Sequence, residues 1–202
     1  MIDGALRRAF DVTVAGAALL AASPFLLVAM VAIRLESRGS AIYRQRRVGR
    51  EGRPFDVLKL RTMVSGAEHL GRGLAVSEGD TRITRVGRLL RRWSLDEVPN
   101  LVNVLRGEMA IVGPRPTVPV QVDRYTERQR GRLAVNPGLT GWAQVQGRAS
   151  LPWGERIELD LWYVEHESLL LDLKILSRTI RTVLHGGGLY KGETGGWRDP
   201  PR

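Results

Sequence analysis

The sequence contains no cysteine among its 202 residues, which excludes disulfide bridges, zinc sites with thiolate ligands and a thiol nucleophile. The three histidines, His69, His166 and His185, are not spaced as metal ligands. The GxGxxG, Walker and GxSxG patterns of many nucleotide-binding and hydrolytic sites are absent too, and no internal repeat occurs. Any chemistry must therefore come from other side chains.

Lysine is scarce: Lys59, Lys174 and Lys191 are the only three among 31 basic residues, and the other 28 are arginine. Against 21 acidic residues the formal net charge is +10, which favours an anionic partner such as a nucleic acid, a phospholipid surface or a phosphorylated small molecule. Charge alone does not choose among the three. The length fits one domain with a substantial core rather than two large domains.

Charge is missing altogether from residues 12–33, and a straight helix of these 22 residues would reach roughly 33 Å, enough to cross a bilayer. Pro24 lies near the middle, where it removes a backbone hydrogen bond and bends a helix, and Ser23 can bond to a freed carbonyl. Arginines flank both ends, so the positive-inside rule predicts that both ends are cytoplasmic: Arg7, Arg8, Arg34, Arg38, Arg44, Arg46 and Arg47.

This pattern favours a helix-break-helix that enters and leaves the membrane on one face. A straight membrane span stays open as an alternative. A cleaved signal peptide fits less well because the apolar run continues past the position where cleavage would occur. A buried soluble helix also fits less well, since the run is longer than the usual apolar core segment.

Residues 41–63 predict a two-stranded hairpin, because residues 41–49 and 55–63 alternate apolar and polar side chains around a turn. Lys59 and Arg61 fall on the same strand face and are both available to one anion. A solvated edge strand is the structural alternative. A lysine in a chain that otherwise uses arginine favours a functional role.

An amphipathic helix is predicted from Thr81, where apolar residues recur at helical spacing and five arginines lie mostly on other faces without an acid among them. Ser94 and Glu97 resemble a capping box, which predicts a second helix from Leu95 to Gly107 with a bend near Pro99. The arginines are Arg82, Arg85, Arg88, Arg91 and Arg92.

Asp96 and Glu97 would lie in the first turn of that second helix, where acids are ordinary because the helix dipole stabilises them. Their surroundings favour a further role, since nearby arginines keep a carboxylate ionised and able to act as a nucleophile or metal ligand. A divalent ion would let such an acid approach a phosphate without repulsion.

Two stiff loops and two late helices complete the chain. Arg115 lies between Pro114 and Pro116, so its guanidinium projects from a restrained backbone and suits bidentate contact with phosphate, although a simple turn is the alternative. Residues 135–148 form a second, glycine-rich loop, and helices are predicted over 153–166 and 168–185. Asp160 and Asp172 on these helices could be partners of cations, but the pattern by itself favours ordinary surface salt bridges.

Taken together, the chain resembles the monotopic phosphoglycosyl transferases, bacterial sugar transferases that begin polysaccharide or glycan assembly on a lipid carrier. The resemblance covers nearly the whole chain in family order and is closest to the minimal catalytic form. Two departures concern Gln146, where the family usually has Asn, and "DEVPN" in place of the commoner "DELPQ". The motifs are the helix broken at Ser23-Pro24, "FDVLKLRTM", "SLDE", "NVLRGEMAIVGPRP", "NPGLTGWAQVQGR" and "LDLWYVEHESLLLDLKIL".

The resemblance implies a two-step reaction, in which a UDP-sugar binds with Mg²⁺, Asp96 attacks the β-phosphate, UMP leaves, and a polyprenyl phosphate takes the phosphosugar. Glu97 would assist with the metal or a proton. The implied phosphate contacts are Lys59, Arg61, Arg88 and Arg115. The implied loop and supporting residues are Pro114, Pro116, Gly141, Gln144, Asp160 and Asp172.

The expected fold is mostly helical α+β, with a re-entrant helix in residues 1–38, a catalytic domain in 39–188 and a flexible tail in 189–202. The implied location is the cytoplasmic face of the inner membrane, with the bilayer, a UDP-sugar and a polyprenyl phosphate as partners. A non-catalytic basic module is the competing class. Nucleic acid is not expected, because it leaves the apolar segment and the paired acids unexplained. The sugar, the polyprenol and a homodimer stay open.

Overall fold

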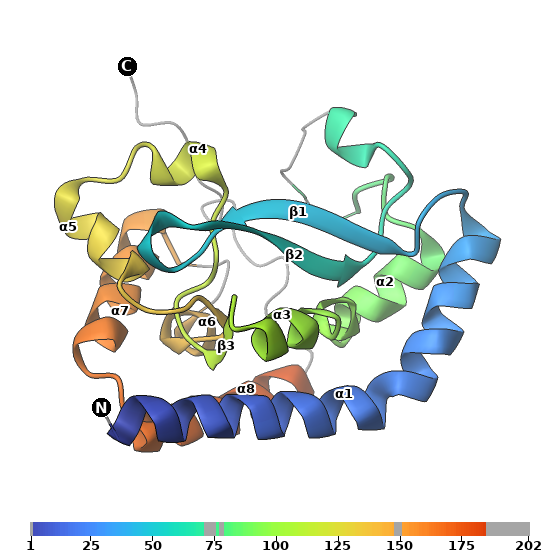
Figure 1. Cartoon of the computed structure of the whole chain (residues 1–202). Helices are drawn as coiled ribbons and strands as arrows, with labels where there is room; N and C mark the ends of the chain where they lie inside the picture. Colours follow the sequence, from blue (N-terminus) through green and yellow to red (C-terminus); the bar gives the residue numbers. More distant parts are fainter. Residues whose placement is uncertain (1, 71–75, 77–78, 148–150, 185–202) are drawn as a thin grey trace.

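The computed structural model describes residues 2–70, 76, 79–147 and 151–184, without the side chains of residues 2, 3 and 184 (Figure 1). Within that part the protein is a mostly helical α+β fold with a long apolar N-terminal helix and two small sheets. The expected tail at 189–202 lies outside the described residues. The division of the chain at residues 38 and 188 stays a prediction.

Helix α1 (Ile2–Glu36) is continuous through Pro24, so the expected break is a bend within one helix (Figure 1). Ser23 Oγ donates to the Leu20 carbonyl at 2.8 Å, as expected for a hydroxyl in the turn beside a proline. The helix is long and apolar enough to cross a membrane, and only 11% of its most apolar window is buried. The buried soluble helix considered from the sequence is therefore wrong. Exposed apolar side chains include Leu20, Leu27, Val28, Val31 and Leu35.

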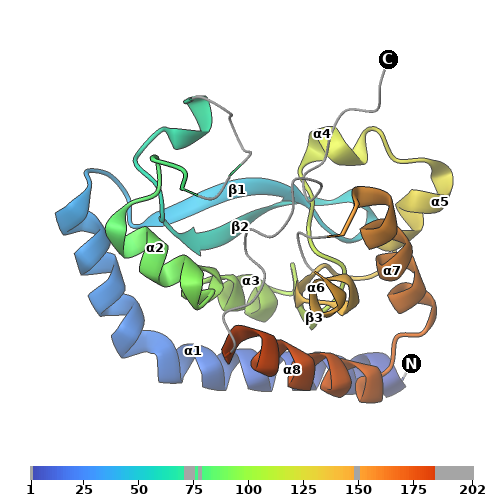
Figure 2. The same ribbon diagram turned by 180° about the vertical axis from the view of Figure 1, so that it is seen from behind.

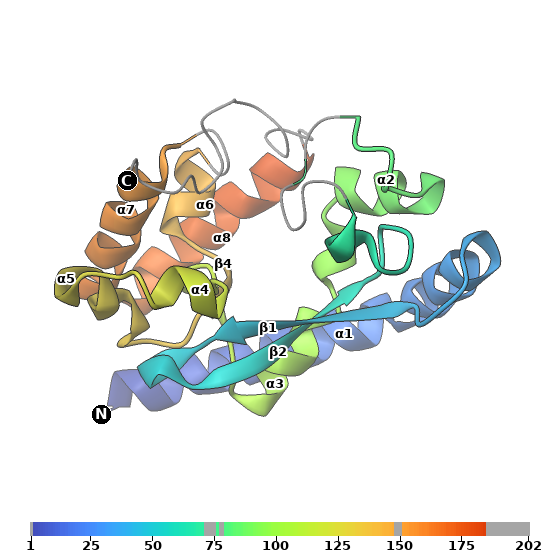
Figure 3. The same ribbon diagram turned by 90° about the horizontal axis from the view of Figure 1, so that it is seen from above.

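The hairpin prediction is confirmed. Strands β1 (Ile42–Val48) and β2 (Pro54–Leu60) pair antiparallel around a single 3₁₀ turn, η1 (Arg50–Gly52). Phe55 and Val57 alternate inward and are buried, as the period of two requires. Figures 1 and 3 show the hairpin lying above α1, with helix α3 (Asn100–Arg106) between them.

After η2 (Ala67–His69), helix α2 (Arg85–Arg92) begins where Thr84 Oγ1 accepts from the Gly87 amide at 2.9 Å. The capping box predicted at Ser94 is wrong: Ser94 has φ 55° and its side chain makes no capping bond. One 3₁₀ turn follows, η3 (Leu95–Glu97), and α3 begins only after Pro99. A proline is tolerated at a helix start but not inside a helix, so Asp96 and Glu97 lie in a tight turn instead.

A second sheet, which was not predicted from the sequence, includes part of the glycine-rich loop 135–148. Strands β3 (Ala110–Val112) and β4 (Gly138–Thr140) pair in parallel, and each is three residues long. A Cβ atom on Gly138 would collide with the Gly113 backbone, so glycine permits this close approach. The two stiff loops are thereby joined to one another at the centre of the fold.

The later helices lie above, beside and below β3 in Figure 2, and the two predicted late helices are confirmed as α7 and α8. The main core joins β2, α3, β3, α7 and α8 through Val57, Val104, Ile111, Tyr163 and Ile175. The elements are α4 (Pro119–Val122), α5 (Glu127–Arg130), η4 (Gly131–Leu133), α6 (Trp142–Gln146), α7 (Trp153–Glu165) and α8 (Leu169–Leu184).

Candidate active site

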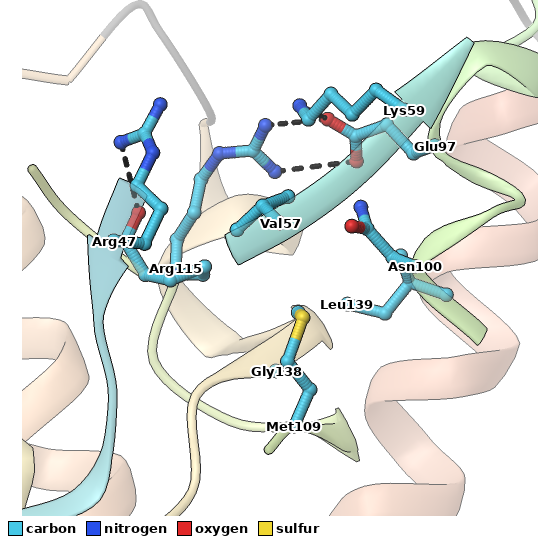
Figure 4. A pocket seen from close by; sticks show the side chains of 10 residues that line it. Arg47, Val57, Lys59, Glu97, Asn100, Met109, Arg115, Gly138 and Leu139 are labelled. Atoms are coloured by element: carbon cyan, nitrogen blue, oxygen red, sulfur yellow. Dashed lines mark hydrogen bonds and ion pairs between the residues drawn. The ribbon is translucent and has the colours of Figure 1, made fainter. Parts of the chain in front are cut away.

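A pocket opens between the hairpin, the turn η3, the start of α3 and the loop that follows β3 (Figure 4). The empty space of the pocket, open solvent included, is about 270 Å³. Three cationic side chains and one carboxylate meet over an apolar base. The lining residues are Arg47, Val57, Lys59, Glu97, Asn100, Met109, Arg115, Pro116, Gly138 and Leu139.

Glu97 joins two of the three cations. Its Oε1 accepts from Lys59 Nζ at 2.6 Å and from Arg115 Nη2 at 2.6 Å, and its Oε2 accepts from Arg115 Nη1 at 3.4 Å. Burial alone would raise the pKa of Glu97, but Arg115 and Lys59 outweigh burial and hold that pKa well below its ordinary value. Glu97 is therefore an anion that keeps two cations in one place.

Asp96 precedes Glu97 in the same 3₁₀ turn but is not among the pocket-lining residues, because successive side chains in such a turn point about 120° apart. In the described part of the chain no other side chain forms a hydrogen bond or ion pair with its half-buried carboxyl group. Burial raises the pKa of Asp96, the Glu97 carboxylate adds to this rise, and Lys59 and Arg91 oppose it. Asp96 is thus the carboxylate of this turn that no described side chain pairs with.

The cations are held in contrasting ways. Burial lowers the pKa of Lys59 despite its ion pair with Glu97, whereas the negative charge of Glu97 raises the pKa of Arg115. The Lys59 side chain is 20% exposed and that of Arg115 is 48% exposed. Lys59 therefore lies deeper in the pocket, and Arg115 lies nearer its mouth.

Arg47 is the third cation, which from the sequence was notable only as one of the charges that flank the apolar segment. It lines the pocket from β1 and donates to the Pro116 carbonyl at 3.2 Å and to Gln45 Oε1 at 2.5 Å. Burial, with the nearby Arg115, lowers the pKa of Arg47 to about 10. Strand alternation could have found it, because Arg47 occupies the same face as Lys59 once the hairpin register is known.

The backbone of Arg115 is fixed from behind by a buried cation. Arg132 donates to the Arg115 carbonyl at 3.0 Å and forms an ion pair with Asp160. Tyr125 Oη accepts a further bond from Arg132. Asp160 is only 2% exposed, so its interpretation as a surface salt bridge was wrong; it is the buried partner of Arg132, and its role in the site stays a prediction.

Asp172 is also buried and also pairs with a cation, but it lies at the attachment of α1 rather than in the pocket. It accepts from Tyr163 Oη at 2.6 Å and from Arg7 Nε at 3.0 Å. The surface interpretation of Asp172 was wrong as well, since its residue exposure is 5%. This cluster joins α7, α8 and α1.

Two predicted phosphate contacts are directed elsewhere. Arg61 follows the end of β2, is 8% exposed and donates to the carbonyls of Ser37 and Arg38, each at 2.7 Å. Arg88 is exposed on α2, where it donates to the Ile83 carbonyl at 3.5 Å. Neither lines the pocket.

The remaining predicted residues support the wall of the pocket. Pro114 accepts from the Gly138 amide at 2.9 Å, and Pro116 lines the pocket itself. Gln144 Nε2 donates to the Leu139 carbonyl at 3.1 Å. Gly141 is required because a Cβ atom there would collide with the Gly113 carbonyl. These residues hold the two loops against one another.

The acidic side chains of the site suit a magnesium ion only if a substrate supplies further ligands. Among the described residues no group of three or more histidine or acidic side chains could hold a metal. Asp96 nevertheless offers an unpaired carboxylate beside a cationic pocket, and Mg²⁺ is commonly held by one or two carboxylates together with waters and substrate phosphates. The site fits an ion that arrives with a phosphorylated substrate.

Comparison with known proteins identifies relatives over most of the chain. The family described as bacterial sugar transferase matches residues 2–186. An uncharacterized sugar transferase, EpsL, of Bacillus subtilis (strain 168) is 42% identical over 186 residues, which are 92% of this chain and 91% of that protein.

Two further relatives have named activities. The UDP-glucose:undecaprenyl-phosphate glucose-1-phosphate transferase of Caulobacter vibrioides is 44% identical, over 91% of this chain and 72% of that protein. The undecaprenyl-phosphate galactose phosphotransferase of Salmonella typhimurium is 37% identical, over 92% of this chain and 42% of that protein. The resemblance predicted from the sequence motifs is confirmed, and the chain belongs to the bacterial sugar transferase family.

Proposed function

We propose that this enzyme transfers a sugar 1-phosphate from a UDP-sugar to undecaprenyl phosphate, the first membrane-bound step of exopolysaccharide or glycoconjugate assembly. The observation that carries the proposal is the Asp96–Glu97 turn, in which one carboxylate gathers Lys59 and Arg115 and the other is left unpaired. The activities named for the relatives support the same donor and acceptor classes.

The chemistry assigned to Asp96 is nucleophilic. A carboxylate oxygen of Asp96 attacks the β-phosphorus, the bond from that phosphorus to the bridging oxygen breaks, and UMP leaves with the oxygen and its electron pair. An oxygen of the lipid phosphate then attacks the phosphorus held on Asp96. The carboxylate departs with its electron pair, and the product is a polyprenyl diphosphate sugar.

Lys59, Arg115 and Arg47 bind and orient the diphosphate in this scheme. Positive groups fixed around a transferring phosphoryl group stabilise the charge that develops on its oxygens. Glu97 holds Lys59 and Arg115 at one place before the substrate binds, so little rearrangement is needed afterwards. Arg132 and Asp160 keep the Arg115 backbone in position.

Asp96 would be the protein ligand of a Mg²⁺ ion that binds with the donor. The ion would supply neutralisation of the diphosphate charge, so that an anionic carboxylate can approach phosphorus. Glu97 is less suited to hold it, because both of its oxygens already accept bonds from cations.

The enzyme is expected at the cytoplasmic face of the inner membrane, with α1 re-entrant rather than spanning. This proposal is supported by bonds at both ends of α1 to the same body. Arg8 donates to the carbonyls of Val104 and Leu105 at 2.6 and 2.8 Å, while near the other end Glu36 accepts from the amides of Arg85 and Val86 at 2.6 and 2.9 Å. A straight span would place these two ends on opposite sides of the bilayer.

The test is UMP release by protein in lipid nanodiscs that contain undecaprenyl phosphate, with a panel of UDP-hexoses and UDP-N-acetylhexosamines. We expect one or more donors to release UMP in proportion to lipid-linked sugar, and Asp96→Asn to abolish release. Asp56→Asn is the matched control, since Asp56 is an exposed acid on β2 that pairs with exposed Arg46. Folded protein that releases UMP from no UDP-sugar would refute the proposal and favour the non-catalytic basic module.

A further inference from the structure

Among the described residues, Asn100 is the one that lines the pocket with a polar side chain that forms no hydrogen bond or ion pair within the protein. It is 3% exposed, and its Oδ1 is buried without a hydrogen-bond partner. No described residue bonds either atom of the carboxamide. Figure 4 shows the group on the same side of the pocket as Glu97 and directed into it. A buried acceptor without a partner is costly, so its retention calls for a ligand.

The next buried asparagine on the same helix gives the contrast. Asn103 is fully buried and fully bonded: its Oδ1 accepts from the Leu58 amide at 3.2 Å, and its Nδ2 donates to the Asp56 carbonyl and to Glu108 Oε2, each at 2.8 Å. Asn103, which holds α3 against the hairpin, is therefore satisfied within the fold. Asn100 is left unsatisfied at the place where the substrate would lie.

The chemistry of the pocket indicates what Asn100 would bind. Phosphate oxygens are acceptors, and Lys59, Arg47 and Arg115 supply the donors that they need. An Oδ1 atom needs the opposite kind of partner, a donor. Next to the diphosphate of a UDP-hexose, the neutral donors are the hydroxyl groups of the hexose on one side and of the ribose on the other.

We propose that Asn100 is a donor-recognition residue whose carboxamide accepts a hydrogen bond from a sugar hydroxyl of the UDP-sugar, beside the phosphates held by the three cations. This inference rests on the proposed function. It adds a contact that depends on a hydroxyl group of the UDP-sugar, whereas the three cations interact only with the charge of its phosphates. Loss of the contact would leave a buried hydroxyl unpaired, and such a loss weakens recognition by roughly 5- to 100-fold.

The experiment compares Asn100→Leu with Asn103→Leu, two identical changes three residues apart on α3 that keep the branching of the side chain and remove its polar atoms. Asn100→Leu removes an unsatisfied polar group, so we expect a melting temperature at or above that of the wild type. Its kcat/KM for the UDP-sugar should fall by roughly 5- to 100-fold, while KM for undecaprenyl phosphate stays unchanged. Asn103→Leu leaves the Leu58 amide unpaired and should melt lower.

Donor analogues that lack one hydroxyl separate recognition from a structural role. For the wild type, removing the recognised hydroxyl from the donor should lower kcat/KM as much as Asn100→Leu lowers it for the complete donor. For the Asn100→Leu variant, kcat/KM should be the same with that analogue as with the complete donor. Competition by UMP, which carries ribose but no hexose, shows which of the two sugars carries the recognised hydroxyl. A variant with weakened UMP binding assigns the ribose hydroxyl, and one with unchanged UMP binding assigns the hexose.

An unchanged kcat/KM for Asn100→Leu would overturn the inference and assign the pocket amide to an ordered water. If Asn100→Leu melts as low as Asn103→Leu, Asn100→Ala is tested with the same analogues, and equal losses on every analogue would also overturn it. Wild-type protein that turns over no UDP-sugar would refute the proposed function instead, so the two failures are distinguishable.

Discussion

Replacement of Arg115 by lysine keeps the positive charge but removes the planar fork of the guanidinium. Arg115 contacts both oxygens of Glu97, at 2.6 and 3.4 Å, so it can hold one carboxylate oxygen and turn its other nitrogen toward a phosphate. A single ammonium offers no such fixed pair of donors. The loss of one charge-assisted hydrogen bond costs about 1.5–3 kcal/mol, which corresponds to roughly a 10- to 150-fold fall in kcat/KM.

The same change should scarcely affect folding. Because the Arg115 side chain is 48% exposed, its ion pair with Glu97 contributes about 1 kcal/mol or less to the free energy of unfolding. For a chain of this size that corresponds to a fall of about 2–4 °C in melting temperature at most. The measurement is UMP release against donor concentration, together with a melting curve in the same nanodiscs.

Arg128→Lys is the matched control, since Arg128 is 69% exposed, pairs with Glu158 at 2.7 Å and does not line the pocket. It should retain wild-type activity. Near-normal activity of Arg115→Lys would contradict the account and leave Arg115 as a turn residue between two prolines. A large fall in melting temperature would show instead that the ion pair with Glu97 is structural.

Three further predictions test neighbouring parts of the account. Glu97→Gln should lower turnover by about 10²- to 10⁴-fold, because Lys59 and Arg115 lose their common anion, while a slow phosphosugar adduct still forms. Mass spectrometry of quenched protein measures the adduct, and its complete loss would refute this prediction. Arg47→Gln should raise KM for the UDP-sugar by roughly tenfold without changing KM for the lipid, as measured by UMP release; an unchanged donor KM would contradict its role in the pocket. Cysteines introduced at Asp3 and Ser40 should both be shielded from an impermeant thiol reagent outside intact cells, and Pro24→Ala should expose one of them in part; labelling of one cysteine in the unmodified helix would favour a straight span.

The sequence predicted those helices and strands whose own residues carry a regular pattern of apolar and polar side chains. The hairpin followed from strict alternation, and α7 and α8 followed from apolar residues at helical spacing. Alternation placed Lys59 and Arg61 on one strand face, available to one anion, but in the structure Lys59 lines the pocket and Arg61 donates to the Ser37 and Arg38 carbonyls instead. At Ser94 two local signals conflicted, because the capping pattern predicted a helix and Pro99 opposed it. The proline prevailed since it removes a backbone donor outright.

Features that depend on contacts between distant segments could not be predicted in the same way. Strands β3 and β4 are too short for periodicity to reveal them, and each exists only because the other lies beside it. The burial of Asp160 likewise depends on Arg132, 28 positions away. Asn100 was visible only as a departure from a family motif, since an amide without a partner is defined by the surrounding structure.

The central claim is that Asp96 carries the phosphosugar between donor and lipid. The most direct measurement is mass spectrometry of protein quenched after exposure to UDP-sugar and Mg²⁺ without a lipid acceptor. The account predicts a phosphosugar mass on the peptide that contains "WSLDEVPNLVNVLR" in the wild type and no such mass in Asp96→Asn. An adduct that survives Asp96→Asn, or transfer to lipid with neither adduct nor UMP release before lipid is added, would contradict it.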